Sequence, residues 1–411
     1  MIKLNSHSNS IFLPALGIAC TLGVGKQAVD KALFGQQKSP LTSTESLFSG
    51  KIVPVGRVPF DLPCLGLEFE DLKSRNNSLL QLVLDEIAPC VNQAKALYGP
   101  RRIGVVLATS TSGMLEGEQS FCHQEQTGMW PIGYRYTQQE IASPSAFTAR
   151  YFGLGGPAYT ISTACTSSAK ALCSAKRLIN SGICDAVIAG GADTLCSLTL
   201  NGFDSLELLT EKVCNPFSKN RQGITIGEGA AIFLVTREKI SDSGKIELLG
   251  YGESSDAYHM SSPDPEGKGA EIAIKEALKM AALTPNEISY LNLHGTGTLL
   301  NDAMESTCIS RIFGQTLPCS STKALTGHTL GAAGAIDAAF LWLALSQEKN
   351  GAVPLPPHIW DGERDLQLDL IRLTRHGEHA TAFGERIALM SNSFAFGGNN
   401  VSLILSKNLN N

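Results

Sequence analysis

The sequence predicts an α/β protein that contains βαβ units in a covered parallel sheet, and two observations carry this prediction. Apolar segments of strand length flank a segment with helical spacing over residues 157–193, in the order strand, helix, strand. Beyond residue 287, apolar segments of strand length again occur, here with Gly/Thr-rich loops. Nearly continuous apolar strands are typical of a parallel sheet whose two faces are both covered by helices.

The first half of the chain is expected to supply strands at residues 11–20, 101–113, 157–162 and 184–193. The strand at 101–113 runs into a turn of small residues. Beyond Cys165, apolar residues recur at helical spacing, which predicts a helix that ends near Ser181.

The second half is expected to supply strands or strand–loop segments at residues 288–298, 317–328, 385–393 and 401–407. Residues 329–347 predict a helix so rich in Gly and Ala that it packs closely on its neighbours. The similar rhythm of the two halves suggests internal duplication. We therefore expect two halves, residues 1–245 and 246–411.

Composition limits the class of protein. The 411 residues are 43% hydrophobic and 17% charged, which indicates an ordered globular protein with a large buried area. The net charge of −5 argues against a nucleic-acid partner. No apolar run approaches the ~18 residues of a membrane span.

The eleven cysteines are an odd number and are scattered without Cys-x-x-Cys pairs or zinc-like spacing. This pattern predicts reduced thiols in a cytoplasmic protein and no metal site. The segment "IFLPALGIAC" loosely resembles a lipoprotein signal that ends at Cys20. However, it is short and interrupted by Pro14, so we interpret it as a core strand.

Cys165, in "ISTACTSSAK", is a candidate nucleophile because it lies where a strand turns into a helix. Unpaired backbone N–H groups at a helix N-terminus carry partial positive charge, which can lower the pKa of a thiol. The alternative is a buried structural cysteine, since most free cysteines are small buried hydrophobes.

Two histidines, His294 in "LHGTGT" and His328 in "LTGHTLGAAGA", follow apolar strands and are framed by Gly and Thr. Such loops bring backbone and ligand close together, although either ring could instead be a hydrogen-bonded interior group. Lys323 is expected near the end of a buried strand, with Glu305 and Asp302 as candidate partners. The alternative for Lys323 is a surface side chain.

One cysteine and two histidines allow two mechanisms. A papain-like protease is disfavoured because its "CGSCW" motif is absent. The other mechanism is acyl transfer to a thiolate followed by carbon–carbon bond formation. That chemistry needs an oxyanion hole and donors for an enolate oxygen, and two neutral imidazoles suit the second task without a metal.

The motifs "TACTSSA", "LHGTGTLLNDAMES", "STKALTGHTLGAAGA" and "SNSFAFGGNN" together resemble the β-ketoacyl-acyl carrier protein synthases of the elongating, Cys-His-His type. The similarity extends over essentially the whole chain. It implies a thiolase-like five-layer α-β-α-β-α sandwich of two duplicated halves. It also implies a dimer with active sites near the dimer interface.

The resemblance implies a two-stage reaction. Cys165 takes an acyl group from acyl carrier protein, with the backbone N–H groups of Cys165 and Phe396 as the oxyanion hole. Malonyl-carrier protein then loses CO2 while His294 and His328 donate hydrogen bonds to the enolate oxygen, and the enolate attacks the acyl-cysteine. Lys323 is expected to be held by Glu305. No cofactor is expected beyond the phosphopantetheine of the carrier.

The resemblance also implies substrate-binding residues, namely Ser112 as the acyl-pocket gate, Thr296, Thr298, Phe394, Gly397 and Gly398. This chain departs from the family's "GFGGTN" pattern, because Ala395 replaces a glycine and Asn399 a threonine. Ala395 is expected to alter the gating turn, because alanine avoids positive φ. Lys170 is unusual so near the nucleophile; it either assists the thiolate or points away.

An acidic carrier protein would need a local basic surface on this acidic chain. The candidate docking residues are Lys73, Arg75, Lys212, Lys219 and Arg221. The alternative for Lys73 and Arg75 is an ordinary solvated helix face.

The predicted function is therefore a condensing enzyme of a dissociated fatty acid or specialised polyketide or polyene pathway, as a homodimer or a heterodimer. One alternative is a non-catalytic partner subunit that shapes a heterodimer's acyl tunnel, which the intact Cys165 and histidines disfavour. Another is a starter-unit synthase or thiolase, which the second histidine, His328, disfavours.

Overall fold

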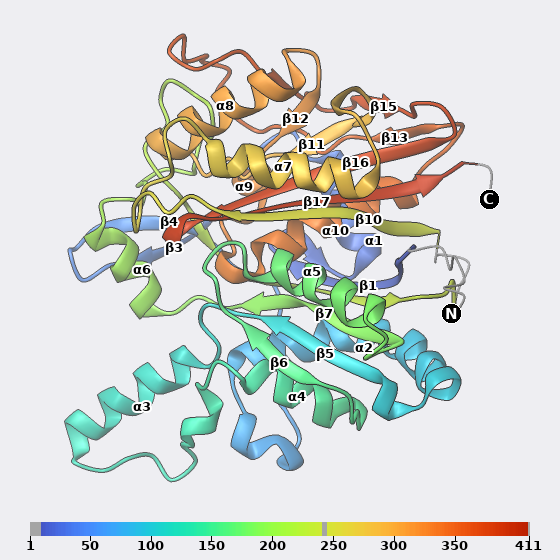
Figure 1. Ribbon diagram of the computed structural model, residues 1–411. Helices are drawn as coiled ribbons and strands as arrows, with labels where there is room; N and C mark the ends of the chain where they lie inside the picture. Colours follow the sequence, from blue (N-terminus) through green and yellow to red (C-terminus); the bar gives the residue numbers. More distant parts are fainter. Residues whose placement is uncertain (1–9, 241–244, 410–411) are drawn as a thin grey trace.

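The computed structural model describes residues 10–240 and 245–409. Within these residues the strands of the main sheet run in the order β14-β12-β11-β16-β17-β10-β1-β9-β7-β5-β6, with β2 beside β1 (Figure 1). The helices are α1 (Lys26–Gly35), α2 (Arg75–Tyr98), α3 (Met114–Thr127), α4 (Ser143–Phe152), α5 (Ser167–Asn180), α6 (Ser197–Ser205), α7 (Lys268–Ala281), α8 (Leu299–Phe313), α9 (Lys323–Thr326) and α10 (Ala333–Ser346).

The strands of the main sheet are β1 (Phe12–Cys20), β2 (Gly23–Val24), β5 (Ile103–Ala108), β6 (Ala158–Ile161), β7 (Ala186–Asp193), β9 (Gly229–Thr236), β10 (Ile246–Ser255), β11 (Tyr290–Asn292), β12 (Pro318–Ser320), β14 (Arg372–Leu373), β16 (Arg386–Ala395) and β17 (Asn399–Asn408). The remaining strands form two small sheets: β3 (Ser43–Ser46), β4 (Ile52–Gly56) and β8 (Ile226–Gly227) in one, β13 (Ala352–Pro354) and β15 (His379–Thr381) in the other.

The sheet repeats one topology twice. Strands β1-β9-β7-β5-β6 pair as antiparallel, antiparallel, parallel and parallel. Strands β10-β17-β16-β11-β12 pair in the same sequence of directions. This repetition confirms the expected duplicated fold. The second set begins at Ile246, and the division of the chain into two domains at that point stays a prediction.

The layers follow from where apolar residues are buried. Helices α5 and α10 lie between the two halves of the sheet, α2 and α4 cover the outer face of the first half, and α7 and α8 cover that of the second (Figure 1). Separate apolar cores fill the central space and the two outer spaces. The halves join where β1 pairs with β10, with Phe12 opposite Glu247, so hydrogen bonding is continuous between them.

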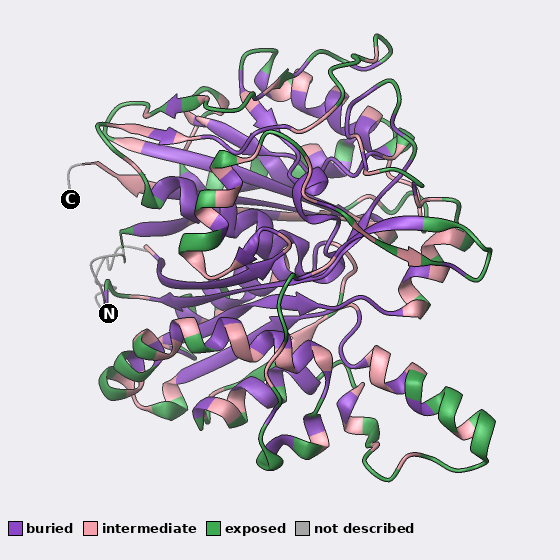
Figure 2. Ribbon diagram, turned by 180° about the vertical axis from the view of Figure 1, so that it is seen from behind, coloured by how far each residue is buried: buried purple, intermediate pink, exposed green. Residues whose placement is uncertain are grey.

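The Gly/Ala-rich helix α10 is buried along nearly its whole length. Buried residues fill the interior of the molecule (Figure 2). At Gly334, an added Cβ would lie 2.8 Å from Cβ of Ala169 on α5. This close approach agrees with the close packing expected of the helix. One difference from expectation is that residues 323–326 form the short helix α9 instead of a loop.

The described helices include none that is long and apolar enough to cross a membrane. All eleven cysteines are free thiols. Helix α3 extends from the body of the protein, and much of its surface and that of the following loop is exposed (Figure 2).

Candidate active site

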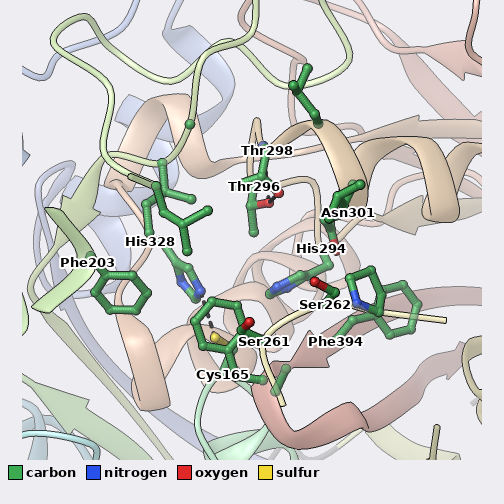
Figure 3. A pocket seen from close by; sticks show the side chains of 18 of the residues that line it. Cys165, Phe203, Ser261, Ser262, His294, Thr296, Thr298, Asn301, His328 and Phe394 are labelled. Atoms are coloured by element: carbon green, nitrogen blue, oxygen red, sulfur yellow. Dashed lines mark hydrogen bonds between the residues drawn. The ribbon is translucent and has the colours of Figure 1, made fainter. Parts of the chain in front are cut away.

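Cys165 lies in the turn between β6 and α5, directly before the helix begins. The preceding residue, Ala164, has φ +53°, a backbone conformation that residues other than glycine rarely adopt. This sharp turn directs the thiol toward His328, whose Nε2 lies 2.9 Å from Sγ (Figure 3). Local backbone strain of this kind is typical of functional positions.

His328 is held by its backbone. Its N–H donates to the Thr225 carbonyl at 2.6 Å, and its own carbonyl accepts from Gly227 N at 2.9 Å. An added Cβ at Gly227 would lie 2.2 Å from the Thr326 carbonyl oxygen, so only glycine permits this approach. Strand β8, which contains Gly227, therefore sets the position of the histidine.

His294 follows β11 and is placed by a carboxylate. Glu305 Oε1 accepts from His294 N at 2.8 Å, and Oε2 accepts from Gly295 N at 2.7 Å. The His294 and His328 rings lie 5.4 Å apart and nearly perpendicular. Figure 3 shows both rings pointing toward Cys165 in one pocket.

Burial makes the three groups neutral at neutral pH. Although the Cys165 residue is partly exposed, burial raises the pKa of its thiol to about 12. Burial and the positive charge of Lys323 lower the pKa of His328 to about 3, and burial also lowers that of His294. The expected lowering of the thiol pKa by the helix N-terminus is thus wrong, because burial outweighs it.

The expected partner of Lys323 is also wrong. Lys323 Nζ donates to Asp337 Oδ2 at 2.9 Å, and both side chains are almost fully buried. Thr322 Oγ1 donates to the other oxygen of Asp337. Asp337 lies on α10, and no local pattern indicated that this helix would supply a carboxylate to α9.

Glu305 and Asp302 instead accept hydrogen bonds from backbone N–H groups. Burial raises the pKa of Glu305 to about 8, while its two N–H donors oppose that rise. Asp302 accepts from Phe217 N at 2.8 Å and from Gly297 N at 3.2 Å. Both carboxyl groups therefore shape the Gly/Thr loop that follows β11.

Four predicted substrate-binding or catalytic residues line the pocket together with the Cys-His-His group, namely Thr296, Thr298, Phe394 and Phe396. Beside Ala395, which was singled out as a departure, the pocket is lined by residues to which the motifs assigned no role: Phe203, Glu207, Leu208, Gln222, Gly223, Ile224, Asp256, Ser261, Ser262, Pro263, Leu299, Leu300, Asn301 and Asn400. They lie on loops and helix ends without periodicity. Their only sequence signal is proximity to the recognised motifs.

Ser112 does not line this pocket. It is buried, and its hydroxyl donates to the Glu140 carbonyl at 2.7 Å. Its role as a gate stays a prediction. The backbone of Ala395 is extended, with φ −134°, so the expected conflict between alanine and a positive φ is wrong. Positive φ falls on Gly397 and Gly398.

The docking candidates differ in exposure and pairing. Lys73 and Lys212 are exposed, and Lys73 Nζ lies 4.0 Å from Glu70 Oε2. Lys219 pairs with Glu363, and Arg75 with the buried Glu228. Arg221 is wrong as a docking residue, because it is buried and pairs with Asp365 at 2.5 Å.

The ligand atoms of Cys165, His294 and His328 lie within 4.8 Å of one another, close enough to hold a metal ion. Sγ already contacts Nε2 of His328 as a hydrogen-bond partner. The expectation of a metal-free reaction stays a prediction.

Comparisons with known proteins agree with this site. Residues 78–240 match the family model of the beta-ketoacyl synthase N-terminal domain, and residues 246–355 match that of the C-terminal domain. The chain is 33% identical over 324 residues to 3-oxoacyl-[acyl-carrier-protein] synthase 2 of Coxiella burnetii, covering 74% of this chain and 75% of the relative. It is 36% identical to the synthase 2 of Synechocystis sp., covering 77% and 78%.

Solved structures agree as well. One similar chain belongs to the complex of the ketosynthase ApeO with its chain length factor ApeC from Xenorhabdus doucetiae, with 46% identity, a TM-score of 0.89, and 98% and 100% of the two chains covered. A chain of the ishigamide ketosynthase/chain length factor is 26% identical, with a TM-score of 0.84 and 97% and 99% covered. This protein is therefore a condensing acyltransferase that belongs to the beta-ketoacyl synthase family.

Proposed function

We propose that this protein condenses a malonyl group with an acyl chain held on Cys165, both delivered by acyl carrier protein. The observation that carries the proposal is the contact of 2.9 Å between Cys165 Sγ and His328 Nε2, with the His294 ring beside them in one pocket. A neutral thiol against a neutral imidazole is a nucleophile next to its base.

In the first stage, His328 Nε2 accepts the Cys165 proton as sulfur attacks the thioester carbonyl. The bond between the carbonyl carbon and the carrier sulfur breaks, and the proton leaves on the carrier thiol. Backbone N–H groups of Cys165 and Phe396 stabilise the tetrahedral oxyanion. The acyl chain is then a thioester of Cys165, and His328 is again neutral.

In the second stage, the malonyl group on the carrier loses CO2 and leaves an enolate. The N–H of His294, and that of His328 once its proton has moved from Nδ1 to Nε2, stabilise the enolate oxygen, and the enolate carbon attacks the Cys165 thioester. The carbon–sulfur bond breaks, the thiolate takes up a proton, and a β-ketoacyl-carrier product leaves. Donors of this type are each typically worth ~10²–10³ in rate.

Acyl carrier protein is the proposed partner because relatives at 33–36% identity are named 3-oxoacyl-[acyl-carrier-protein] synthases. Lys73, Lys212 and Lys219 are the remaining docking candidates on the surface. We propose no cofactor beyond the carrier's phosphopantetheine. We also propose a cytoplasmic location, which the free state of all eleven cysteines supports.

A second ketosynthase-like chain is the proposed subunit partner, identical or related. Ketosynthase and chain length factor are paired in the complexes of two similar structures. The sheet ends at β6, and α3 with its following loop exposes large apolar side chains: Phe121, Met129, Trp130, Ile132, Tyr136 and Ile141. An unpaired edge strand and an exposed apolar surface are both features that a partner covers.

Relatives are named 3-oxoacyl-[acyl-carrier-protein] synthases, and similar structures include ketosynthases with chain length factors, so a fatty acid and a specialised pathway both stay within the proposal. The alternative role, a partner subunit that only shapes the acyl tunnel, has no use for a nucleophile. The assembled Cys165, His294 and His328 therefore favour the catalytic role.

The test is to incubate the purified protein, alone and with its partner subunit, with acyl-carrier proteins of varied chain length. Mass spectrometry of peptides should find the acyl group on Cys165, and malonyl-carrier protein should then give CO2 and a β-ketoacyl product. Cys165→Ala should abolish acylation. His328→Ala should lose CO2 release while still binding the carrier protein.

Acylation at another residue, or normal condensation by Cys165→Ala, would contradict the mechanism. Undiminished CO2 release by His328→Ala would contradict the enolate-donor role alone.

A further inference from the structure

Lys170 and Asn399, two departures from the family pattern, meet in the structure. Lys170 lies on the first turns of α5, the helix that begins just after Cys165. Its Nζ donates to Asn399 Oδ1 at 2.7 Å, and both residues are half-buried. The side chain of Lys170 is therefore directed at the turn after β16.

Asn399 closes that turn. It pairs with Ala395 in the last register position of β16 and β17, and residues Phe396–Gly398 form the turn between them. Asn399 Nδ2 lies 3.5 Å from where a Cβ would stand on Gly397. The Asn399 amide thus lies between the Lys170 ammonium and the turn that carries Phe396.

The turn is held on its other side by the loop after β10. Gly397 N donates to the Met260 carbonyl at 2.7 Å, and Asp256 N donates to the Gly398 carbonyl at 2.8 Å. Among the hydrogen bonds of residues 10–240 and 245–409, the Lys170–Asn399 contact alone joins α5 to residues 395–400. It links the helix that begins just after the nucleophile to the turn that carries Phe396.

We propose that Lys170 is a positioning residue that holds the Phe396–Gly398 turn in register with Cys165. The inference rests on the proposed function, in which the N–H groups of Cys165 and Phe396 together stabilise the oxyanion. Such donors act only when they lie 2.7–3.1 Å from the developing charge. Small displacements of a donor are costly in rate, so a hydrogen bond that sets this spacing affects acyl transfer.

Lys170 Nζ contacts the turn through Asn399, whereas the positive charge of Lys323 acts on the Cys165 thiol. Alkylation of Cys165 by iodoacetamide needs the sulfur and access to it but no oxyanion hole. Acylation by a thioester needs the sulfur, access to it and the oxyanion hole. The two rates separate a positioning role from a general effect on the site.

The experiment compares Lys170→Met, Asn399→Leu and the double variant. Each single variant should acylate Cys165 about tenfold more slowly, with the iodoacetamide rate unchanged within twofold. The double variant should be no slower than either single variant, because both remove one contact. Asn399→Asp keeps the acceptor oxygen and should retain the wild-type rate.

Arg177→Met is the matched control. Arg177 lies two turns further along α5 and pairs with Glu253 on β10, away from the Phe396 turn. It removes a cation of the same helix and should leave both rates unchanged. Equal losses of acylation and alkylation in Lys170→Met, or no loss of acylation, would overturn the proposal.

Hydrogen–deuterium exchange tests the same contact without catalysis. Peptides covering residues 396–399 should exchange faster in Lys170→Met than in the wild type or Arg177→Met, and unchanged exchange would overturn the proposal. If wild-type Cys165 is not acylated by any acyl-carrier protein, the proposed function fails. The exchange measurement then still decides whether Lys170 holds the turn.

Discussion

Cys165 and His328 face each other as a thiol and a neutral imidazole, because burial opposes charge on both. A helix N-terminus stabilises a thiolate only within its first turn and only partly. In the proposed mechanism, the proton therefore moves when the substrate carbonyl is attacked, and not in the resting enzyme. This arrangement also limits reaction of the thiol with other electrophiles.

The pH dependence of alkylation tests the neutral thiol. Below a thiol pKa of about 12, the thiolate fraction rises tenfold for each pH unit. The rate of Cys165 carboxymethylation by iodoacetamide should therefore rise continuously from pH 6.5 to 9.5 without a plateau, as followed by mass spectrometry of the Cys165 peptide. A plateau near pH 7 would contradict the raised pKa and restore the helix-terminus interpretation.

Lys323 and Asp337 form a buried ion pair, so removing one partner should leave an uncompensated charge. Lys323→Met should lower the free energy of unfolding in urea by about 3–5 kcal/mol. Lys323→Met combined with Asp337→Leu should recover most of that loss. An equal or larger loss in the double variant would show that the pair does more than neutralise charge.

The exposed pair of Lys219 and Glu363 is the control for this measurement. Both side chains are half-exposed, so solvent screens their attraction. Lys219→Met should therefore leave the urea midpoint essentially unchanged.

In the Phe396–Gly398 turn, the conformational need for glycine differs from one position to the next. The backbone of Ala395 is extended, which alanine adopts without strain, so glycine has no conformational advantage at position 395. Gly398 has φ +73°, and an added Cβ would lie 3.0 Å from Cβ of Asp256. The conformational need for glycine is thus at Gly398 and not at position 395.

Thermodynamic stability measures this difference. Ala395→Gly should lower the free energy of unfolding by about 0.5–1 kcal/mol, because glycine loses more backbone entropy on folding. Gly398→Ala should lower it by about 1–2 kcal/mol, because alanine is strained at positive φ. A gain in stability for Ala395→Gly, measured by urea denaturation, would show that Ala395 is strained after all.

At the scale of the whole molecule, the two repeated halves bury polar groups in the interior as well as apolar ones. His358 is an example outside the proposed chemistry. Its Nδ1 accepts from Ser321 N at 3.1 Å, and its Nε2 contacts the Pro216 carbonyl at 3.0 Å. Burial lowers the pKa of His358 to about 4.

Buried neutral histidines make folding sensitive to acid. Between pH 6.5 and about 4, His358 binds a proton in the unfolded chain but not in the folded protein. Stability is therefore lost as the pH falls through this window, by up to about 1.4 kcal/mol per pH unit for this group. Urea denaturation at pH 7.5, 6.0 and 5.0 measures the slope.

His358→Gln isolates this contribution, because glutamine can accept at one atom and donate at the other without titrating. Between pH 6 and 5, the slope of the unfolding free energy against pH should be smaller in the variant by about 1.4 kcal/mol per pH unit, which corresponds to one proton. Identical slopes would show that His358 titrates alike in the folded and unfolded states. Comparing the two proteins cancels the contributions of the other titrating groups.

Sequence patterns were sufficient for features that are local or repeated. Apolar periodicity located most strands and the helix after Cys165, because burial on both faces leaves long apolar runs. The motifs around Cys165, His294 and His328 were sufficient for the family and its chemistry. Bringing those three groups into one pocket requires the ends of elements from both halves of the fold.

Only the tertiary structure decided which groups pair across those elements. The sequence suggested a carboxylate partner for Lys323 beside the alternative of a surface side chain, and Asp337 on α10 supplies that carboxylate, since pairing depends on distance in space. Burial, which no local pattern reports for a single thiol, reversed the expected pKa shift of Cys165. Lys170 acquired an interpretation only when the fold placed Asn399 beside it, 229 positions further along the chain.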